Sequence, residues 1–114
     1  MKDCLFCRII NGEILATIVY HDEHLVAFKD VSPQAPTHIL IVPRRHVATL
    51  NDLTVDDNET IGEMVRRASL IAADLGHADA GYRTVFNCNA EAGQTVFHIH
   101  LHLLGGRTLS WPPG

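Results

Sequence analysis

The chain has 114 residues, a length typical of one domain with a single hydrophobic core. Hydrophobic residues make up 46% of it, charged residues make up 19%, and the formal net charge is −4, which argues against a nucleic-acid-binding surface. No apolar run is long enough for a signal peptide or a membrane span, and three cysteines, an odd number, do not form a disulfide framework. We therefore expect a cytoplasmic protein with no nucleic-acid or membrane partner.

The first half of the chain predicts a short helical segment followed by strands. Residues 4–10 form a mixed run, closed by an Asn-Gly turn signal, that is long enough for one or two helical turns. Residues 17–20 and 25–29 are rich in β-branched and aromatic side chains and predict a hairpin. Two prolines exclude regular structure at residues 32–36, and the apolar residues 38–42 predict a buried strand.

The second half predicts one long helix and two further strands. Helical spacing of apolar residues extends over residues 55–75, with Thr54 as the candidate N-cap. Strands are predicted at residues 82–88 and 95–104. This order of elements predicts one α+β domain, residues 1–114, with a mostly antiparallel sheet. The expected buried face of the helix consists of Ile61, Met64, Val65, Ala68, Ala72 and Leu75.

Three histidines occupy alternate positions near the end of the chain. Because a strand points successive side chains to opposite faces, His98, His100 and His102 are expected to share one face. Imidazole titrates near neutral pH, so this row indicates nucleophilic, acid–base or phosphate chemistry. The first and third histidines would lie roughly 13 Å apart along a strand, and one metal ion therefore cannot easily bind all three.

The residues around these histidines add neutral donors. Gly93 lets the backbone approach a ligand closely, while Gln94 offers an amide and Thr95 a hydroxyl, all suited to phosphate oxygens. Asn87, at the end of the preceding strand, can add another donor. His38 opens a buried strand and is either a satisfied core residue or the group that orients a catalytic imidazole.

Cys4 and Cys7 form a C-x-x-C pair, which in a cytosolic chain indicates metal or redox chemistry more often than a disulfide. Two cysteines supply half of a tetrahedral zinc shell, and His46 and His98 are the candidates for the other half. Such a site would join distant segments and would be structural. The alternative is that both cysteines are small apolar residues of the N-terminal segment.

Residues 93–104, GQTVFHIHLHLL, resemble the signature of the histidine triad (HIT) family, and most of all its Hint branch of nucleoside phosphoramidases. Residues 30–38 (DVSPQAPTH), 79–83 (DAGYR) and 111–114 (WPPG) resemble the same branch, so the match runs nearly end to end. The resemblance implies the HIT fold and a purine nucleotide pocket in each subunit. It also implies a homodimer in which two sheets join into one.

The resemblance implies roles for individual residues as well. His100 is the nucleophile that attacks the α-phosphorus and forms a nucleotidyl-histidine, His102 contacts the phosphate, and His98 and His38 support the network. Asp30 holds the ribose hydroxyls. The remaining matching positions are Asn87, Gly93, Gln94 and Thr95 for the phosphate, Phe6, Ile14, Phe28, Val31 and Leu40 for the base, and Trp111 in a tail near the partner's site. No metal or cofactor is required for catalysis in this scheme.

The C-x-x-C pair departs from the best-known Hint pattern. Other HIT relatives carry it and bind zinc, and the matching ligands here are Cys4, Cys7, His46 and His98. The resemblance favours an enzyme that hydrolyses purine nucleoside 5′-phosphoramidates to a nucleoside monophosphate and an amine. One alternative is a nucleotide-binding regulatory module without turnover. Another is a zinc-dependent hydrolase, which would need its metal next to His100.

Overall fold

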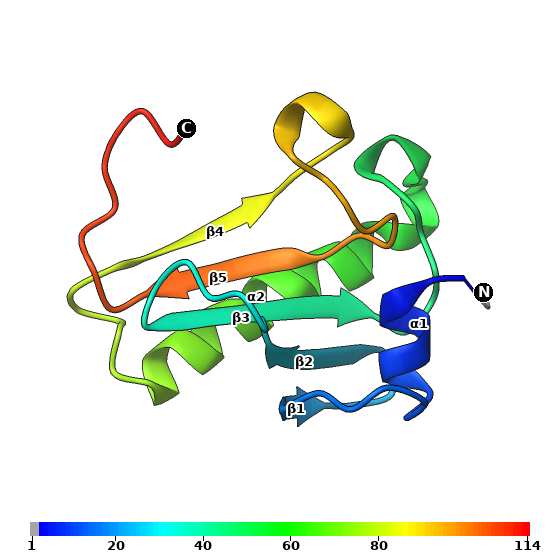
Figure 1. Ribbon diagram of the computed structural model, residues 1–114, viewed down its shortest axis with the longest axis horizontal. Coiled ribbons are helices and arrows are strands. Elements are labelled where there is room, and N and C mark those ends of the chain that lie inside the picture. Colours follow the sequence, from blue (N-terminus) through cyan, green and yellow to red (C-terminus); the bar gives the residue numbers. More distant parts are fainter. Residues whose placement is uncertain (1–2) are drawn as a thin grey trace.

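The computed structural model describes residues 3–114, and its centre is a five-stranded antiparallel sheet (Figure 1). The order of the strands is β1-β2-β3-β5-β4, and every neighbouring pair is antiparallel. This arrangement confirms the predicted α+β class. The strands are β1 (Ile18–His21), β2 (Leu25–Lys29), β3 (Thr37–Pro43), β4 (Tyr82–Phe86) and β5 (Leu101–Gly105). The helices are α1 (Leu5–Ile10) and α2 (Asn58–Asp74), with 3-10 turns η1 (Leu50–Asp52), η2 (Val55–Asp57) and η3 (Ala90–Ala92).

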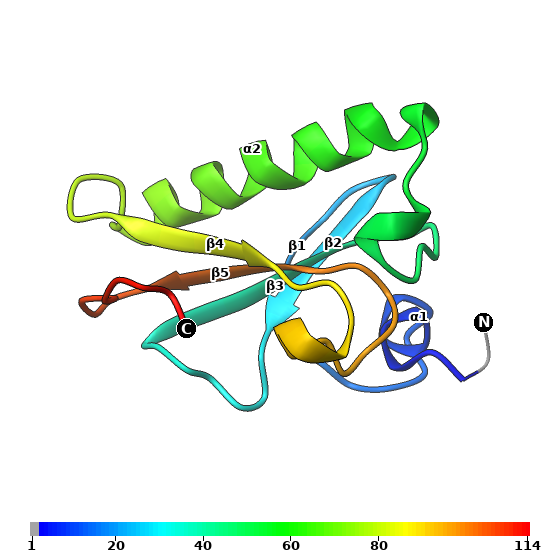
Figure 2. The same ribbon diagram turned by 90° about the horizontal axis from the view of Figure 1, so that it is seen from above.

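Different elements cover the two faces of the sheet. Figure 2 shows α2 along one face, and α1, the η3 loop and the C-terminal tail on the other. This explains why β3 is a continuous apolar run. Ile39 and Ile41 pack with residues of α2, whereas Leu40 and Val42 pack with Phe6 of α1. Within residues 3–114, none of the helices has the length and apolar character needed to cross a membrane.

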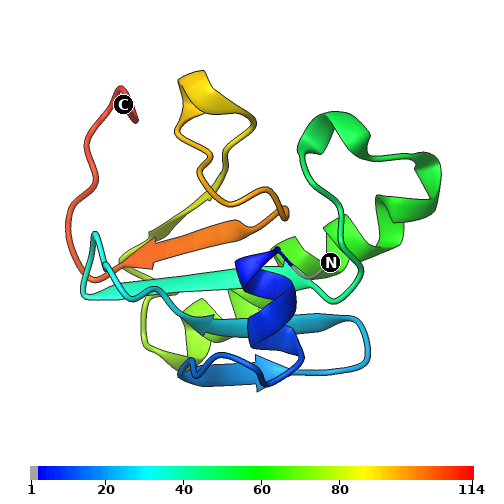
Figure 3. The same ribbon diagram turned by 45° about the vertical axis from the view of Figure 1, so that its right-hand side comes forward.

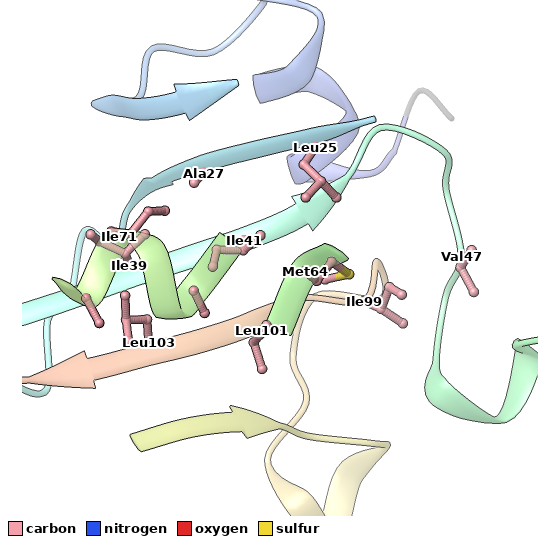
Figure 4. Close-up of a cluster of buried hydrophobic side chains, with 12 residues drawn as sticks. Leu25, Ala27, Ile39, Ile41, Val47, Met64, Ile71, Ile99, Leu101 and Leu103 are labelled. Carbon is pink, nitrogen blue, oxygen red and sulfur yellow. The ribbon is translucent and has the colours of Figure 1, made fainter. Parts of the chain in front are cut away.

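The larger core lies between the sheet and α2 (Figure 4). Burying one aliphatic side chain fully contributes roughly 1.5–3 kcal/mol, so this cluster dominates the stability of the fold. Leu101 and Leu103 of β5 point into it, and His102 between them therefore faces the opposite side of the sheet. The cluster consists of Leu25, Ala27, Ile39, Ile41, Val47, Met64, Ala68, Ile71, Ala72, Ile99, Leu101 and Leu103.

The predicted helix at residues 55–75 is present but differs at its start and on its buried face. It opens as the 3-10 turn η2, which Thr54 caps as predicted, and becomes α-helical at Asn58. Val65 and Leu75, which the spacing predicts to be buried, are 48% and 50% exposed. Ile71, which the spacing does not single out, is buried instead, next to the expected Met64, Ala68 and Ala72.

The predicted strand at residues 95–104 is wrong in its first half, because β5 begins only at Leu101. Both neighbouring strands stop pairing with β5 at that residue, so residues 95–100 have no strand beside them. The backbone N–H of Ile99 donates instead to the carbonyl of Val47, at 2.7 Å. The strand predicted at residues 82–88 likewise ends early, at Phe86.

Candidate active site

A cavity of about 390 Å³ lies beside the start of β5, between α1 and the loop at residues 87–96. Its volume is in the range of small-molecule sites, and its wall combines apolar side chains with a few polar groups, as such sites do. His100 and His102 both line it. Of the residues assigned to a nucleotide by resemblance, nine line this cavity: Phe6, Ile14, Phe28, Asp30, Val31, Leu40, Asn87, Gly93 and Thr95.

Aromatic rings form one wall of the cavity. Phe6 enters from α1, and its ring centroid lies 5.4 Å from that of Phe28 with the planes at 71°. The same Phe6 ring stands edge-on to His100, with centroids 4.9 Å apart and planes at 90°. Both phenylalanines are buried. Together with the aliphatic side chains of Ile14 and Leu40, they offer the flat apolar surface that a heteroaromatic base requires.

The backbone carbonyl of His98, two residues earlier, holds His100 in one tautomer. Its Nδ1 lies 2.8 Å from the carbonyl oxygen of His98, and because a carbonyl only accepts, Nδ1 must carry the proton. Nε2 is therefore left with its lone pair. Burial lowers the pKa of His100, so the imidazole is neutral near pH 7. A neutral imidazole with a free nitrogen on a cavity wall can act as a nucleophile or a base.

His38 and His102 form a hydrogen-bonded chain beside Asp30. The backbone N–H of Gln34 donates to Nδ1 of His38 at 3.0 Å, which leaves the His38 proton on Nε2. That Nε2 donates to Nδ1 of His102 at 2.8 Å and lies 3.4 Å from the Asp30 carboxylate. His102 consequently carries its own proton on Nε2, where it is a donor for a ligand in the cavity.

Burial also keeps this pair neutral. Burial, together with the neighbouring His100 and His38, lowers the pKa of His102 to about 4. Burial lowers the pKa of His38 as well, although the Asp30 carboxylate opposes the shift. The cavity thus presents one imidazole lone pair and one imidazole donor at fixed positions. This combination suits attack on an electrophilic centre whose oxygens need hydrogen bonds.

The loop before β5 is shaped by Gln94, whose side chain is only 5% exposed. Its amide group donates to the carbonyls of Ala48 and Val96 and accepts from the backbone N–H of Asn89. Both amide protons are used, so the side chain has no donor left for a phosphate, contrary to the sequence-based expectation. The neighbouring Gly93 has φ +88°, a left-handed conformation that favours glycine. The Gln94 side chain therefore sets the shape of the loop that Gly93 and Thr95 present to the cavity.

A second cluster joins α1 to the segment before β5. One ligand atom from each of Cys4, Cys7, His46 and His98 lies within 4.8 Å of the others. Nδ1 of His98 is 3.4 Å from Cys4 Sγ, 3.5 Å from Cys7 Sγ and 3.2 Å from His46 Nδ1. A tetrahedron with zinc bonds of about 2.0–2.3 Å has edges of about 3.3–3.8 Å, so these separations fit a metal ion.

The hydrogen bond at Nε2 of His98 also indicates that this ring can bind a metal ion through Nδ1. Its Nε2 lies 2.7 Å from the carbonyl of Pro43 and must donate to it, so Nδ1 faces the cluster with a lone pair. Burial lowers the pKa of His98 to about 4, and the ring is therefore in the neutral form that binds metals. A ligand histidine that donates its second ring N–H to a carbonyl is a common outer-shell arrangement. The four residues can hold a metal ion.

Trp111, which the resemblance assigns to a site on the partner subunit, is 82% exposed and lies in the C-terminal tail, outside the cavity of its own chain. Sequence reasoning also missed several lining residues, of which only Leu5 and Ile9 had a signal, their i, i+4 spacing on a short helix. The missed residues are Leu5, Ile9, Leu15, Ala16, Lys29 and Val96.

Known proteins resemble this chain in sequence and in fold. The HIT domain family matches residues 11–109. The purine nucleoside phosphoramidase of Escherichia coli strain K12 is 47% identical over 108 residues, covering 95% of this chain and 91% of that protein. The crystal structure of a HIT family hydrolase from Legionella pneumophila Philadelphia 1 superposes with a TM-score of 0.97 at 54% identity, covering 98% of this chain and 100% of the other.

A metal-containing structure is also similar. A zinc-bound histidine triad family protein from Mycobacterium smegmatis superposes with a TM-score of 0.80 at 33% identity, covering 93% of this chain and 76% of that one. The family match covers most of the chain, and the similar proteins agree with it in sequence and in fold. This chain therefore belongs to the HIT family of hydrolases.

Proposed function

We propose that this protein hydrolyses purine nucleoside 5′-phosphoramidates to a nucleoside monophosphate and an amine. The observation that carries the proposal is the state of His100: the His98 carbonyl holds its Nδ1 proton, its Nε2 lone pair has no hydrogen-bond partner among residues 3–114, and its ring lines the cavity. The similarity to a protein named purine nucleoside phosphoramidase supports the choice of substrate. In this proposal the base lies against Phe6 and Phe28, and Asp30 accepts hydrogen bonds from the ribose hydroxyls.

The first step is nucleophilic. Nε2 of His100 attacks the α-phosphorus, a P–Nε2 bond forms, and the P–N bond to the leaving group breaks. The positive charge that develops on the imidazole strengthens the hydrogen bond from Nδ1 to the His98 carbonyl. In this proposal Thr95, Asn87 and the backbone at Gly93, which all line the cavity, donate to the phosphate oxygens as their charge spreads.

The second step is hydrolysis of the nucleotidyl-histidine. Water attacks phosphorus, the P–Nε2 bond breaks, and the imidazole of His100 returns to its neutral form. Overall one water is consumed, with its hydroxyl on phosphorus and its proton on the amine. His102 carries its proton on Nε2 in the cavity, so in this proposal it gives that proton to the leaving nitrogen in the first step and recovers a proton from the attacking water in the second. Splitting one displacement into two lowers the barrier of each.

The metal proposed for Cys4, Cys7, His46 and His98 is zinc, and it takes no part in these steps. When bound, it supplies a cross-link between α1 and the segment before β5. The separations within the cluster and the similarity to a zinc-bound relative support this assignment.

We also propose a homodimer. Strand β4 is an edge of the sheet, so its outer backbone groups are unpaired within residues 3–114 and can pair with a second copy. An antiparallel pair of β4 strands would join the two sheets into one. It would also give the exposed Trp111 a place near the partner's cavity, as the resemblance implies.

Activity is tested with adenosine 5′-phosphoramidate as substrate, with AMP quantified. Wild type should hydrolyse this substrate. His100→Ala should lose activity by on the order of 10⁴-fold or more, because without the nucleophile the remaining groups of the site cannot carry out the covalent step. His24→Ala, at an exposed histidine outside the cavity, is the matched control and should retain full activity. Circular dichroism checks that both variants fold. If the wild type binds AMP without turnover, the protein is instead a nucleotide-binding module.

A further inference from the structure

The metal-ligand cluster and the candidate active site share one helix, α1. Cys4 is the N-cap of α1 and Cys7 lies within it, while Phe6 between them lines the nucleotide cavity. Figure 3 shows α1 lying across the end of β3, beside the segment that leads into β5. A helix of six residues is too short to be stable alone. Its position therefore depends on the packing of Phe6 against β2 and β3 and on what holds its two cysteines.

The first link from the cluster to the site runs through Phe6. The Cys4 thiol accepts a hydrogen bond from the backbone N–H of Cys7, so the two cysteines and Phe6 form one turn. Phe6 is 4% exposed and touches both Phe28 and His100 edge-on. Any shift of that turn moves the ring away from the base pocket and from the nucleophile together.

The second link runs through the backbone of His98. Its imidazole is held on both sides, by the Pro43 carbonyl at Nε2 and by the cysteines and His46 at Nδ1. The carbonyl oxygen of this same residue accepts the Nδ1 proton of His100 at 2.8 Å. Fixing the His98 ring therefore restricts the carbonyl that sets the tautomer of His100.

The cluster is also reachable from outside the protein. Cys4 and His46 line a second cavity of about 580 Å³, which Asp3 and Phe97 border as well. A carboxylate at this entrance favours an approaching cation. A metal ion can thus enter and leave the cluster without passing through the hydrophobic core.

We propose that metal occupancy of the Cys4, Cys7, His46 and His98 cluster controls nucleotide binding, because the same ligands position Phe6 and the His98 carbonyl. The inference rests on the proposed function only in placing the nucleotide in the cavity lined by His100. Coupling between two sites is reciprocal: if the metal tightens nucleotide binding, the nucleotide tightens metal binding by the same factor. A metal bound elsewhere that does not act on the cavity would leave the Kd of the nucleotide unchanged, a coupling factor of one.

The test measures both directions with Zn²⁺ and AMP. Calorimetry gives the Kd of AMP for zinc-loaded and for chelator-treated protein, and competition with a chromophoric chelator gives the zinc affinity with and without saturating AMP. We expect zinc to tighten AMP binding about tenfold and AMP to tighten zinc binding by the same factor. Equal AMP affinity in both forms, or a zinc affinity that ignores AMP, would overturn the coupling. Circular dichroism checks that the chelator-treated protein stays folded; if chelation unfolds it, a drop of the coupling in Phe6→Leu but not in Arg8→Ala decides instead.

Two variants of α1 test whether the coupling between zinc and AMP depends on the Phe6 ring. Phe6→Leu keeps all four metal ligands, so zinc binding without AMP should be unchanged while the coupling falls below about threefold. Arg8→Ala, at an exposed position of α1 away from the cavity lining, should keep the full coupling. Coupling that is undiminished in Phe6→Leu would contradict the proposed route through that ring. Failure of AMP to bind zinc-loaded wild type would instead refute the proposed function itself.

Discussion

The histidines of the site differ in chemistry because a different ring nitrogen is fixed in each. His98 donates from Nε2 to a carbonyl and turns its Nδ1 lone pair to the metal cluster. His100 donates from Nδ1 and turns its Nε2 lone pair to the cavity. His102 accepts at Nδ1 from His38 and keeps a proton on Nε2. Through their hydrogen-bond partners alone, identical side chains two residues apart are thus suited to three different proposed roles: ligand, nucleophile and donor.

The lowered pKa of His102 predicts acid-sensitive stability. Burial, with the neighbouring histidines, lowers the pKa from 6.5 to about 4 in the folded state. Between pH 6.5 and 4 the unfolded chain therefore binds a proton that the folded chain does not, and the free energy of unfolding falls as the pH falls through this window. At roughly 1.4 kcal/mol per pKa unit, discounted for solvent screening because the ring is only partly buried, the loss attributable to this residue is on the order of 1–2 kcal/mol.

Urea unfolding at a series of pH values checks this prediction. His102→Gln keeps a side-chain N–H but cannot gain a charge, so its stability should fall less steeply between pH 6.5 and 4 than that of wild type. The difference between the two curves measures the contribution of His102 together with its coupling to His38 and His100. Parallel curves would show that this residue does not titrate differently in the folded and unfolded states.

At the scale of elements, the loop at residues 89–94 depends on one buried amide. Gln94→Leu is similar in size but leaves the Asn89 N–H and two carbonyls without their partner. Each buried group left unpaired costs roughly 1–3 kcal/mol, so the variant should be destabilised by at least that amount. Gln34→Leu is the matched control, because that side chain is exposed, and it should change stability by less than about 0.5 kcal/mol. Equal urea midpoints for the two variants would contradict the role given to Gln94.

Two glycines predict opposite effects of the same substitution. Gly62 lies in α2, and a Cβ added there would meet no atom within 4 Å, so Gly62→Ala should stabilise the protein by roughly 0.5–1 kcal/mol. Gly106 follows β5 with φ +93°, and a Cβ there would lie 2.9 Å from Cβ of Pro36. Gly106→Ala should therefore destabilise it by roughly 1–3 kcal/mol or more. Thermal unfolding of both variants tests the pair, and a Tm shift of the same sign in both would contradict it.

Sequence patterns predicted the elements better than their ends. The β2 strand at residues 25–29 was located correctly because its side chains and flanking turns both mark it. The late start of β5 within the predicted strand at residues 95–104 had no local signal, because it depends on where β3 and β4 stop pairing. Alternation nevertheless placed His100 and His102 together, with ring centroids 4.9 Å apart.

In the site as well, local sequence signals identified residues but did not show how separate segments meet. Residue type and spacing pointed to the cysteines and histidines of the metal cluster, which the structure brings together. The fate of Gln94 was not readable, since its partners Ala48 and Asn89 are set by how two loops meet. Exposure of Val65 and Leu75 on α2 likewise follows from how the helix sits on the sheet, which periodicity alone leaves open.

At the scale of the whole molecule, the two faces of the sheet have separate tasks. The core under α2 anchors β5 through Leu101 and Leu103, while the opposite face holds the cavity and the metal cluster. A change on the cavity side can therefore alter binding without removing the main source of stability. The remaining surface of the sheet is its pair of edges, β1 and β4.

The exposed edge of β4 is the surface through which we expect two copies of the chain to pair. Thr84 is the middle residue of β4 and is exposed in the single chain. In a two-fold antiparallel pair of β4 strands, the central residue of one copy lies near the same residue of the other. Thr84→Lys would bring two ammonium groups together at that point, and lysine on an edge strand opposes pairing. Light scattering should then report the mass of one chain for the variant and of two chains for wild type. A matched Thr17→Lys change, at an exposed position next to the opposite edge, should leave the dimer intact, and a dimeric Thr84→Lys protein would exclude pairing through β4.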